Sequence, residues 1–354
     1  MLNKIGWGDA PPYVFVPIWD KLTSIGVDET AEGQVQNLYV SICYTFAPEN
    51  FVVHKPVGLL QVRGEKRADS LTPFAPIYEN QGIKNSMKIK NCNVLITGGA
   101  SGIGKIMGRM ALEKGAKGLI IWDINEQNIA ATVEEFSAKG NVKGYRVDVG
   151  NIEAVRSAYA TTVKECGDVD VLINNAGIIT SNKTFDQVDV AEIDRTMLIN
   201  ALAPMYVTRE ILPDMLRRQQ GHVCNITSAG GMLGNPRMAV YGASKWAAIG
   251  WSDSVRIELQ EQKSKVRVTT ITPYYINTGM FNGVKSPIIP ILNPERTAAK
   301  ILRAVEKNLI FRGIPFGLHF IRFWQFVLPI SVFDFFFGKV FGIYHTMDNF
   351  VGRK

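Results

Sequence analysis

The stretch Asn93–Gly104 constrains the fold of this chain more than any other. Its sequence, NVLITGGASGIG, starts with the apolar run Val94–Ile96, stops at glycines, and leads into a helical pattern over Ile106–Lys114. A Cβ would block a tight turn, a bound pyrophosphate or close helix packing at three positions, which are Gly98, Gly102 and Gly104. The helix would present its N-terminal N–H groups and positive dipole end to an anion. The stretch therefore predicts the strand, turn and helix of a dinucleotide-binding site.

An acidic residue follows at the distance that such a site requires. Twenty-five residues after Gly98, the apolar run Leu119–Trp122 ends in Asp123, which alone would be interpreted as a helix cap. A carboxylate at the end of the second strand accepts hydrogen bonds from both ribose hydroxyls and would repel a 2′-phosphate. Ile124 follows it and Ser101 precedes Gly102, so no Arg or Lys is available to bind that phosphate. The predicted cofactor is NAD.

Composition excludes several other classes of protein. The 354 residues are 46% hydrophobic, enough for a full α/β core with length left for extensions. The net charge is +7, but the basic residues are scattered, so we expect no nucleic-acid partner, whereas an anionic membrane surface remains compatible. Four cysteines without CxxC spacing and four dispersed histidines predict no metal site. Met1–Asp20 lacks the apolar core of a secretory signal, which predicts an intracellular protein.

Strands and helices alternate along the chain from Lys88 onward, which is typical of a parallel sheet. After the first two strands, the expected strands are Gly144–Val149, an apolar run from Val169 to the Asn-Asn-Ala-Gly ending at Gly177, His222–Thr227 and Val266–Ile271. The expected helices are Asn125–Lys139, Ile152–Cys166, one around Arg195–Leu212, and one from Tyr241. About six alternations predict an α/β fold with one doubly wound parallel sheet of the Rossmann type, in a single catalytic domain over residues 86–309.

Both flanks depart from this alternation. Residues 1–85 mix Pro, Gly, Asn and charges with short apolar runs, and we assign this N-terminal extension no role. In the C-terminal extension, residues 310–354, the stretch Arg312–Phe337 is aromatic and aliphatic. Its longest uncharged run, Phe323–Phe333, has 11 residues and is too short to cross a bilayer. Two interpretations stay open: a buried helix or lid over the substrate pocket, and a segment lying on a membrane or lipid droplet.

Tyr241 and Lys245 form an i, i+4 pair on one face of the helix that starts at Tyr241. An ammonium beside a phenol favours the phenolate, so we expect the pKa of Tyr241 to fall from about 10 toward the working pH. Such a tyrosine can exchange a proton with an alcohol or carbonyl oxygen. Ser228 ends a strand thirteen residues earlier and would direct its hydroxyl into the same cleft, although an isolated serine there would simply cap the turn.

Taken together, in this order and at these intervals, the motifs closely resemble those of the classical short-chain dehydrogenases/reductases, over about residues 90–280. The family's glycine motif, TGxxxGxG, corresponds to Thr97–Gly104, its adenine-contacting aspartate to Asp148, and its backbone-supporting motif to Asn174–Gly177. The resemblance implies cofactor contacts at Gly98, Ser101, Gly102, Ile103, Gly104, Asp123, Asp148, Val149, Asn175, Tyr241, Lys245, Pro273 and Thr278.

The same resemblance implies a catalytic tetrad of Asn200, Ser228, Tyr241 and Lys245. Tyr241 would be the general acid/base and Ser228 would hold the reacting oxygen. Lys245 would lower the pKa of Tyr241 and bind the nicotinamide ribose, and Asn200 would keep a water in the proton relay. One departure is Pro273-Tyr274 in place of the family's Pro-Gly, so we expect a stiffer or displaced loop on the nicotinamide side.

Within the family, three stretches resemble the branch of retinol dehydrogenases and 17-beta-hydroxysteroid dehydrogenases of membranes and lipid droplets: Trp122–Asn125, Asn277–Phe281 and Met347–Gly352. This resemblance implies NAD-dependent interconversion of a lipophilic alcohol, of retinoid or steroid type, and its carbonyl. It also implies a homo-oligomer, at the endoplasmic reticulum membrane or a lipid droplet, or otherwise in the cytoplasm. The alternatives are a reductase of another carbonyl substrate and a non-catalytic NAD-binding protein at lipid surfaces.

Overall fold

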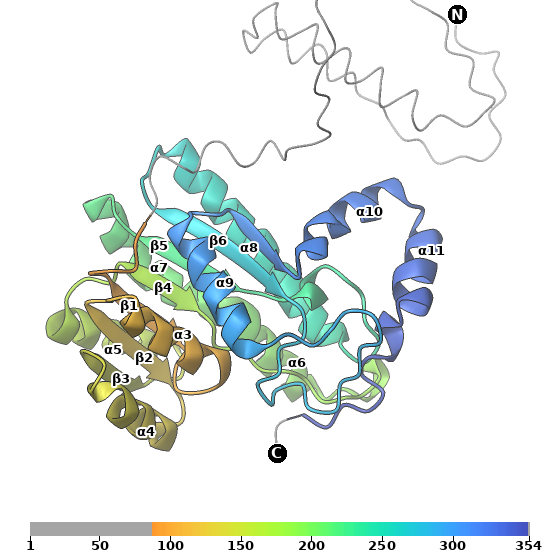
Figure 1. Cartoon of the computed structure of the whole chain (residues 1–354), viewed down its shortest axis with the longest axis horizontal. Coiled ribbons are helices and arrows are strands. Elements are labelled where there is room, and N and C mark those ends of the chain that lie inside the picture. The colour runs from red at the N-terminus through yellow and green to blue at the C-terminus, as the bar shows by residue number, and fades with distance from the viewer. Residues whose placement is uncertain (1–86, 353–354) are drawn as a thin grey trace, which may run out of the picture. The chain divides into compact units, whose positions relative to one another are not determined.

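A seven-stranded, wholly parallel sheet forms the centre of the protein (Figure 1). The computed structural model describes residues 87–352, within the chain unit Thr72–Lys354, so the predicted extension over residues 1–85 lies outside the described residues. The strand order is β3-β2-β1-β4-β5-β6-β7. The strands are β1 Asn93–Thr97, β2 Gly118–Asp123, β3 Val142–Arg146, β4 Val171–Asn174, β5 His222–Ile226, β6 Arg267–Pro273 and β7 Phe311–Ile314. The predicted doubly wound α/β sheet is confirmed.

Helices cover both faces of the sheet because the central strands are apolar on both sides. In β1, Val94 and Ile96 pack with α3, α4 and α9, while Leu95 between them packs with α5, α7 and α8 on the opposite face. The principal helices are α3 Gly102–Glu113, α4 Glu126–Ser137, α5 Ile152–Cys166, α6 Val190–Met197, α7 Ala203–Arg218, α8 Ala239–Glu261 and α9 Pro294–Glu306.

The direction in which successive strands are added to the sheet changes between β1 and β4. From β1 the order runs through β2 to β3 on one side, and from β4 to β7 on the other. The carboxyl ends of β1 and β4 are therefore where a doubly wound sheet binds its ligand. Asn175, which follows β4, donates its backbone N–H to the Thr97 hydroxyl at the end of β1, over 3.0 Å. The predicted motifs thus meet at this edge.

Several element boundaries differ from those predicted. Helix α3 begins at Gly102 rather than Ile106, since its own glycines form the first helical turn. Strand β3 ends at Arg146, and Asp148 and Val149 lie beyond it at the ligand edge. The helix expected around Arg195–Leu212 is longer and is interrupted by a π-helical segment, η4, over Leu198–Leu202. Patterns of apolar residues do not distinguish a π-turn from an α-turn, so this interruption was not predictable.

The sheet continues beyond residue 309, where the catalytic domain was predicted to end. Strand β7 pairs in parallel with β6, placing Phe311 beside Thr270 and Ile314 beside Pro273. The strand was missed because Arg312 and Gly313 separate its two apolar residues, so no continuous apolar run marks it. The aromatic segment that follows forms η6 Phe316–Phe320, α10 Ile321–Val327, α11 Ile330–Phe333, η7 Asp334–Val340 and η8 Ile343–His345.

Figure 1 shows α10 and α11, in blue, as an arch outside the sheet and its flanking helices. Arg322 on α10 pairs with Asp253 on α8 at 3.2 Å, and Gln325 donates to the Met232 carbonyl at 2.6 Å. Phe326 and Ile330 are 89% and 79% exposed. Within the part of the chain that the structure describes, no helix combines the length and hydrophobicity needed to span a membrane.

Candidate active site

The glycine turn after β1 has the shape of a phosphate-binding turn. Gly98 and Gly102 have positive φ angles of 64° and 53°, which side chains disfavour. A Cβ on Gly104 would overlap the Gly98 carbonyl oxygen. Helix α3 starts without a side-chain cap hydrogen bond from Ser101 and without an acidic residue in its first turn. Its N-terminal N–H groups are thus suited to an anion such as a pyrophosphate.

The Asn175 side chain, which follows β4, holds this turn in place by hydrogen bonds. Its side-chain amide donates to the Thr97 carbonyl at 3.0 Å and to the Gly98 carbonyl at 3.1 Å. The Thr97 hydroxyl accepts the backbone N–H groups of Asn175 and Ala176 at 3.0 Å each. Asn175 therefore holds the turn in place rather than pointing out to a ligand, which fits the supporting role that the sequence motif implied.

The predicted adenosine side of the site lies at the ends of β2 and β3. Asp123 accepts the Ala100 backbone N–H at 3.1 Å, which places its carboxylate against the glycine turn. Its other oxygen accepts the Asn125 N–H at 3.1 Å. Asp148 accepts the Gly150 N–H at 2.9 Å, and the neighbouring Val149 is buried. These residues fit a dinucleotide: the glycine turn would bind the pyrophosphate, the Asp123 carboxylate beside it would bind the ribose, and Val149 offers an apolar position for the adenine.

The remaining predicted cofactor contacts have less distinctive surroundings. Ile103 is partly buried against the core beneath α3, and Pro273 is the buried last residue of β6. The backbone N–H of Thr278 donates to the Ile276 carbonyl at 2.8 Å, in the loop after β6. This loop runs from residue 274 to residue 293 and is termed the substrate loop below.

Ser228, Tyr241 and Lys245 meet beyond the carboxyl end of β5. Tyr241 lies in the first turn of α8, and both its ring and the Ser228 hydroxyl lie against Gly230, 3.4 Å and 3.5 Å from where a Cβ on that glycine would be. The Ser228 hydroxyl also accepts the Gly230 N–H at 3.1 Å. Lys245, one turn further along α8, has its ammonium nitrogen 5.8 Å from the centre of the Tyr241 ring and 3.2 Å from the Ile226 carbonyl oxygen. Both Tyr241 and Lys245 are buried.

Asn200 reaches the same region from the π-helical segment. Its side chain accepts the Ile178 N–H and donates to the Ile178 carbonyl, both at 2.8 Å. It also donates to the Ser244 hydroxyl at 3.1 Å, which in turn donates to the Tyr241 carbonyl at 2.7 Å. Asn200 is thereby linked to the helix turn that carries Tyr241. All four residues of the expected tetrad therefore lie in one neighbourhood.

The proton affinities differ from the prediction. Burial raises the pKa of Tyr241 to about 12, an effect that the nearby Ser228 side chain partly opposes, whereas a lowered pKa was expected. Burial also lowers the pKa of Lys245 to about 8. The physical reason is that an apolar environment disfavours the charged form of both groups. Desolvation therefore outweighs the attraction between ammonium and phenolate that the sequence argument considered.

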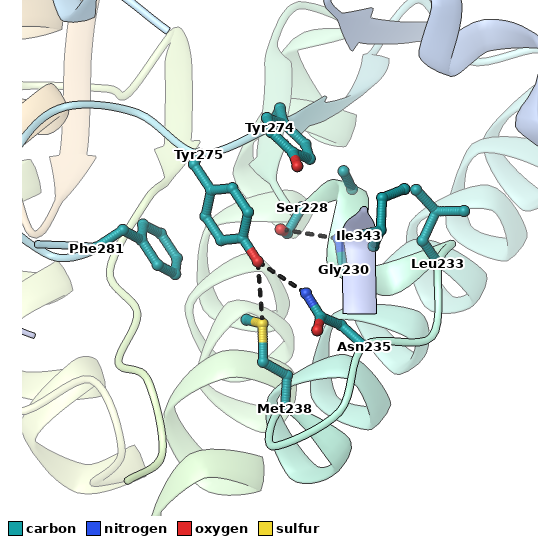
Figure 2. A pocket seen from close by; sticks show the side chains of 10 residues that line it. Ser228, Gly230, Leu233, Asn235, Met238, Tyr274, Tyr275, Phe281 and Ile343 are labelled. Atoms are coloured by element: carbon teal, nitrogen blue, oxygen red, sulfur yellow. Dashed lines mark hydrogen bonds between the residues drawn. The ribbon is translucent and has the colours of Figure 1, made fainter. Parts of the chain in front are cut away.

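A small cavity opens beside Ser228 (Figure 2). Its volume is about 30 Å³, which suits water, whereas small-molecule pockets usually measure 300–1,000 Å³. Its lining comes from the segment after β5, the substrate loop and the C-terminal segment: Ser228, Ala229, Gly230, Leu233, Asn235, Met238, Tyr274, Tyr275, Phe281 and Ile343. Apart from Ser228 and Asn235 the lining is mainly apolar and aromatic.

The substrate loop is held tightly at its start, as the Pro273-Tyr274 departure suggested. The Tyr274 N–H donates to the Ile314 carbonyl at 2.8 Å, and its hydroxyl lies 3.0 Å from that of Ser286. The Tyr274 and Tyr275 rings meet edge to face at 4.6 Å. Tyr275 was not identified from the sequence as a site residue. The doubled tyrosine where Pro-Gly was expected was the one available signal.

Comparisons with known proteins agree with this geometry. Residues 92–288 match the short chain dehydrogenase family. The chain is 34% identical over 267 residues to epidermal retinol dehydrogenase 2 of Homo sapiens, covering 74% of this chain and 85% of that protein. It is 32% identical over 240 residues to estradiol 17-beta-dehydrogenase 11 of Pongo abelii, covering 67% and 79%.

Solved structures share the fold. A short chain dehydrogenase/reductase from Burkholderia phymatum in complex with NAD superposes with a TM-score of 0.63 at 22% identity, covering 70% of this chain and 96% of that one. A metagenomic short-chain oxidoreductase in complex with NADP gives a TM-score of 0.54 at 24% identity, covering 62% and 93%. This chain therefore belongs to the short-chain dehydrogenases/reductases, in the branch of the retinol dehydrogenases and 17-beta-hydroxysteroid dehydrogenases.

Proposed function

We propose that the protein is an NAD-dependent oxidoreductase that interconverts a lipophilic alcohol, of retinoid or steroid type, and its carbonyl. The observation that carries this proposal is that Ser228 and Tyr241 lie together against Gly230, beside a mainly apolar cavity that Ser228 lines. A bound nicotinamide would accept or supply the hydride. The names of the relatives, a retinol dehydrogenase and an estradiol 17-beta-dehydrogenase, support an alcohol of this kind.

The chain's own residues would handle the proton and the substrate oxygen. Ser228 would hold the oxygen by a hydrogen bond, and Tyr241 would donate a proton to it in reduction or accept one in oxidation. Lys245 is close enough to influence the charge on Tyr241 and would also contact the nicotinamide ribose. Asn200 would fix the helix turn through Ser244, in addition to the water-holding role implied by the resemblance.

Replacement of the Tyr241 hydroxyl tests this proposal. Tyr241→Phe should lower kcat by at least about 100-fold, because general acid–base catalysis typically contributes 10²–10⁴ in rate. NAD binding, measured by quenching of tryptophan fluorescence, should change little. Tyr274→Phe is the matched control, since it removes the hydroxyl of another tyrosine on the same cavity and should retain most of the activity. Turnover should be followed at the nicotinamide absorbance with retinoid, steroid and aliphatic alcohols. Turnover only of small polar sugars or acyl-thioesters would contradict the substrate class.

NAD preference rests on Asp123, whose carboxylate lies against the glycine turn. Because a 2′-phosphate would be repelled there, the double change Asp123→Ala with Ile124→Arg should shift preference toward NADP by about tenfold or more, measured as the ratio of kcat/KM for the two cofactors. An unmodified enzyme that already prefers NADP would contradict the assignment.

Attachment to a membrane or lipid-droplet surface, at the endoplasmic reticulum or elsewhere in the cell, is the second part of the proposal. Aromatic and aliphatic side chains are exposed along the C-terminal segment: Phe316, Phe320, Phe323, Trp324, Phe326, Ile330, Phe335 and Phe336. Aromatic residues of this kind favour the membrane interface.

The proposed homo-oligomer is supported by the family resemblance alone and is measurable by light scattering. Two alternative functions can be told apart from the main proposal. The substrate panel tests for a reductase of another carbonyl, and Tyr241→Phe tests for a non-catalytic NAD-binding protein at lipid surfaces.

A further inference from the structure

The C-terminal strap, defined here as residues 343–351, forms part of the cavity wall although it lies far from the tetrad in sequence. Ile343 lines the cavity, and Met347 is buried in the same apolar cluster as Tyr241 and Tyr275. The strap lies between Gly342 and Gly352, which have positive φ angles of 70° and 74°.

The strap is bonded to two separate loops around the site. The Asn182 amide, after β4, donates to the Met347 carbonyl at 3.0 Å. The Lys285 N–H of the substrate loop donates to the Thr346 carbonyl at 3.2 Å, and the Val351 N–H donates to the Asn282 carbonyl at 2.8 Å. Contact with the substrate loop is so close that a Cβ on Gly283 would overlap the Asn349 carbonyl oxygen.

A buried polar node joins the strap to the other two walls. The Asn235 amide donates to the Tyr275 hydroxyl at 2.9 Å and to the Thr346 hydroxyl at 2.8 Å, while the two hydroxyls lie 3.0 Å apart. The Thr346 hydroxyl donates its own hydrogen to the Ile343 carbonyl at 2.9 Å, so it accepts from both partners. Figure 2 shows the Tyr275 hydroxyl directed toward Asn235 and Met238. Each of the three residues comes from a different segment, and two of them, Asn235 and Tyr275, line the cavity.

The cavity is too small for the substrate class proposed above. A volume of about 30 Å³ holds water, whereas a retinoid or steroid needs several hundred. At least one wall must therefore move. Ser228, Met238 and Tyr241 lie on or next to α8 and β5, whereas the strap and the substrate loop contain no α-helix or strand of their own, so these two segments are the walls best able to move.

We propose that the strap closes the substrate cavity and that Thr346 latches it to Asn235 and Tyr275, so that a lipophilic substrate enters and its product leaves only when this latch opens. The proposal rests on the function proposed above for its substrate. The latch itself is a property of the chain and can be tested without a substrate.

A reversible cross-link tests the latch. In the full-length double variant Asn235→Cys/Thr346→Cys, oxidation should lower kcat/KM for retinol or estradiol by at least tenfold, and dithiothreitol should restore it. NAD binding should be equal in the two states, which shows that the fold is intact. Each single-cysteine variant should be insensitive to oxidation. Equal turnover before and after reduction, with the bridge verified by mass spectrometry, would overturn the proposal.

Hydrogen exchange separates failure of the latch from failure of the proposed function. Thr346→Val keeps the side-chain volume but removes the hydroxyl, so amide exchange in residues 343–352 should accelerate by about tenfold. Tyr274→Phe should leave exchange in the strap unchanged, because the Tyr274 hydroxyl bonds within the substrate loop. Unchanged exchange in Thr346→Val would refute the latch, whatever the substrate. Absence of turnover of every alcohol by the unmodified enzyme would instead refute the proposed function.

Discussion

Lys245 should make the protein less stable at neutral pH than it is in mild alkali. Burial lowers its pKa from 10.5 to about 8. Between these values the unfolded chain binds a proton that the folded protein does not, so stability rises with pH across this window and the full penalty is present below about pH 8. The shift corresponds to roughly 3 kcal/mol, of which roughly 2–3 kcal/mol should be recovered between pH 7 and pH 10.

Lys245→Met should abolish this pH dependence while also lowering turnover. The assay is urea unfolding of both proteins at pH 7 and pH 10, and the relevant quantity is the change in unfolding free energy between the two pH values. Cys92, Cys224 and Tyr241 are buried and have raised pKa values, which lower stability as pH rises toward 10, but they contribute almost equally to both proteins. Lys300→Met, at an exposed position on α9, is the control and should behave like the unmodified protein. An equal pH response in unmodified protein and Lys245→Met would refute the reasoning.

Two further changes test the cofactor turn and the exposed C-terminal surface. Gly104→Ala should weaken NAD binding by at least about tenfold, because the added methyl group would overlap the Gly98 carbonyl oxygen. Gly250→Ala on α8 is the control and should leave binding unchanged, because a Cβ there meets no atom within 4 Å. Fluorescence titration measures NAD binding in both variants. Phe326→Glu with Ile330→Glu should reduce flotation of the full-length protein with anionic liposomes, whereas Val190→Glu, a similarly exposed position on α6, should not.

The sheet and the Tyr241–Lys245 pair were predictable because local sequence carries their geometry, whereas Asn200 followed from the family resemblance alone. A strand buried on both faces needs a continuous apolar run, and a turn with positive φ needs glycine, so β1 and Gly98 follow from the residues themselves. Tyr241 and Lys245 share a helix face by spacing alone. Strand β7 could not be predicted in this way, because Arg312 and Gly313 interrupt the apolar pattern of Phe311–Ile314.

The latch and the proton affinities were beyond local reasoning. Thr346 meets Asn235 across 111 positions of sequence, and neither residue lies in a motif that predicts the pairing. The raised pKa of Tyr241 depends on how completely the fold excludes water from it. The spacing of two residues in the sequence indicates that their side chains are close together. The dielectric around those side chains, however, depends on packing by segments that are distant in the sequence.

The enclosure of Tyr241 and its chemistry are two consequences of the same packing. The packing that buries Tyr241 keeps its phenol protonated, which in the proposed reaction favours proton donation to a carbonyl over proton acceptance from an alcohol. Oxidation therefore requires additional positive charge near Tyr241. Lys245 supplies it only in part, because its own pKa is lowered to about 8. An oxidised nicotinamide is cationic and a reduced one is neutral, so the oxidation state of a bound cofactor would shift the proton affinity of Tyr241 in the direction that each reaction needs.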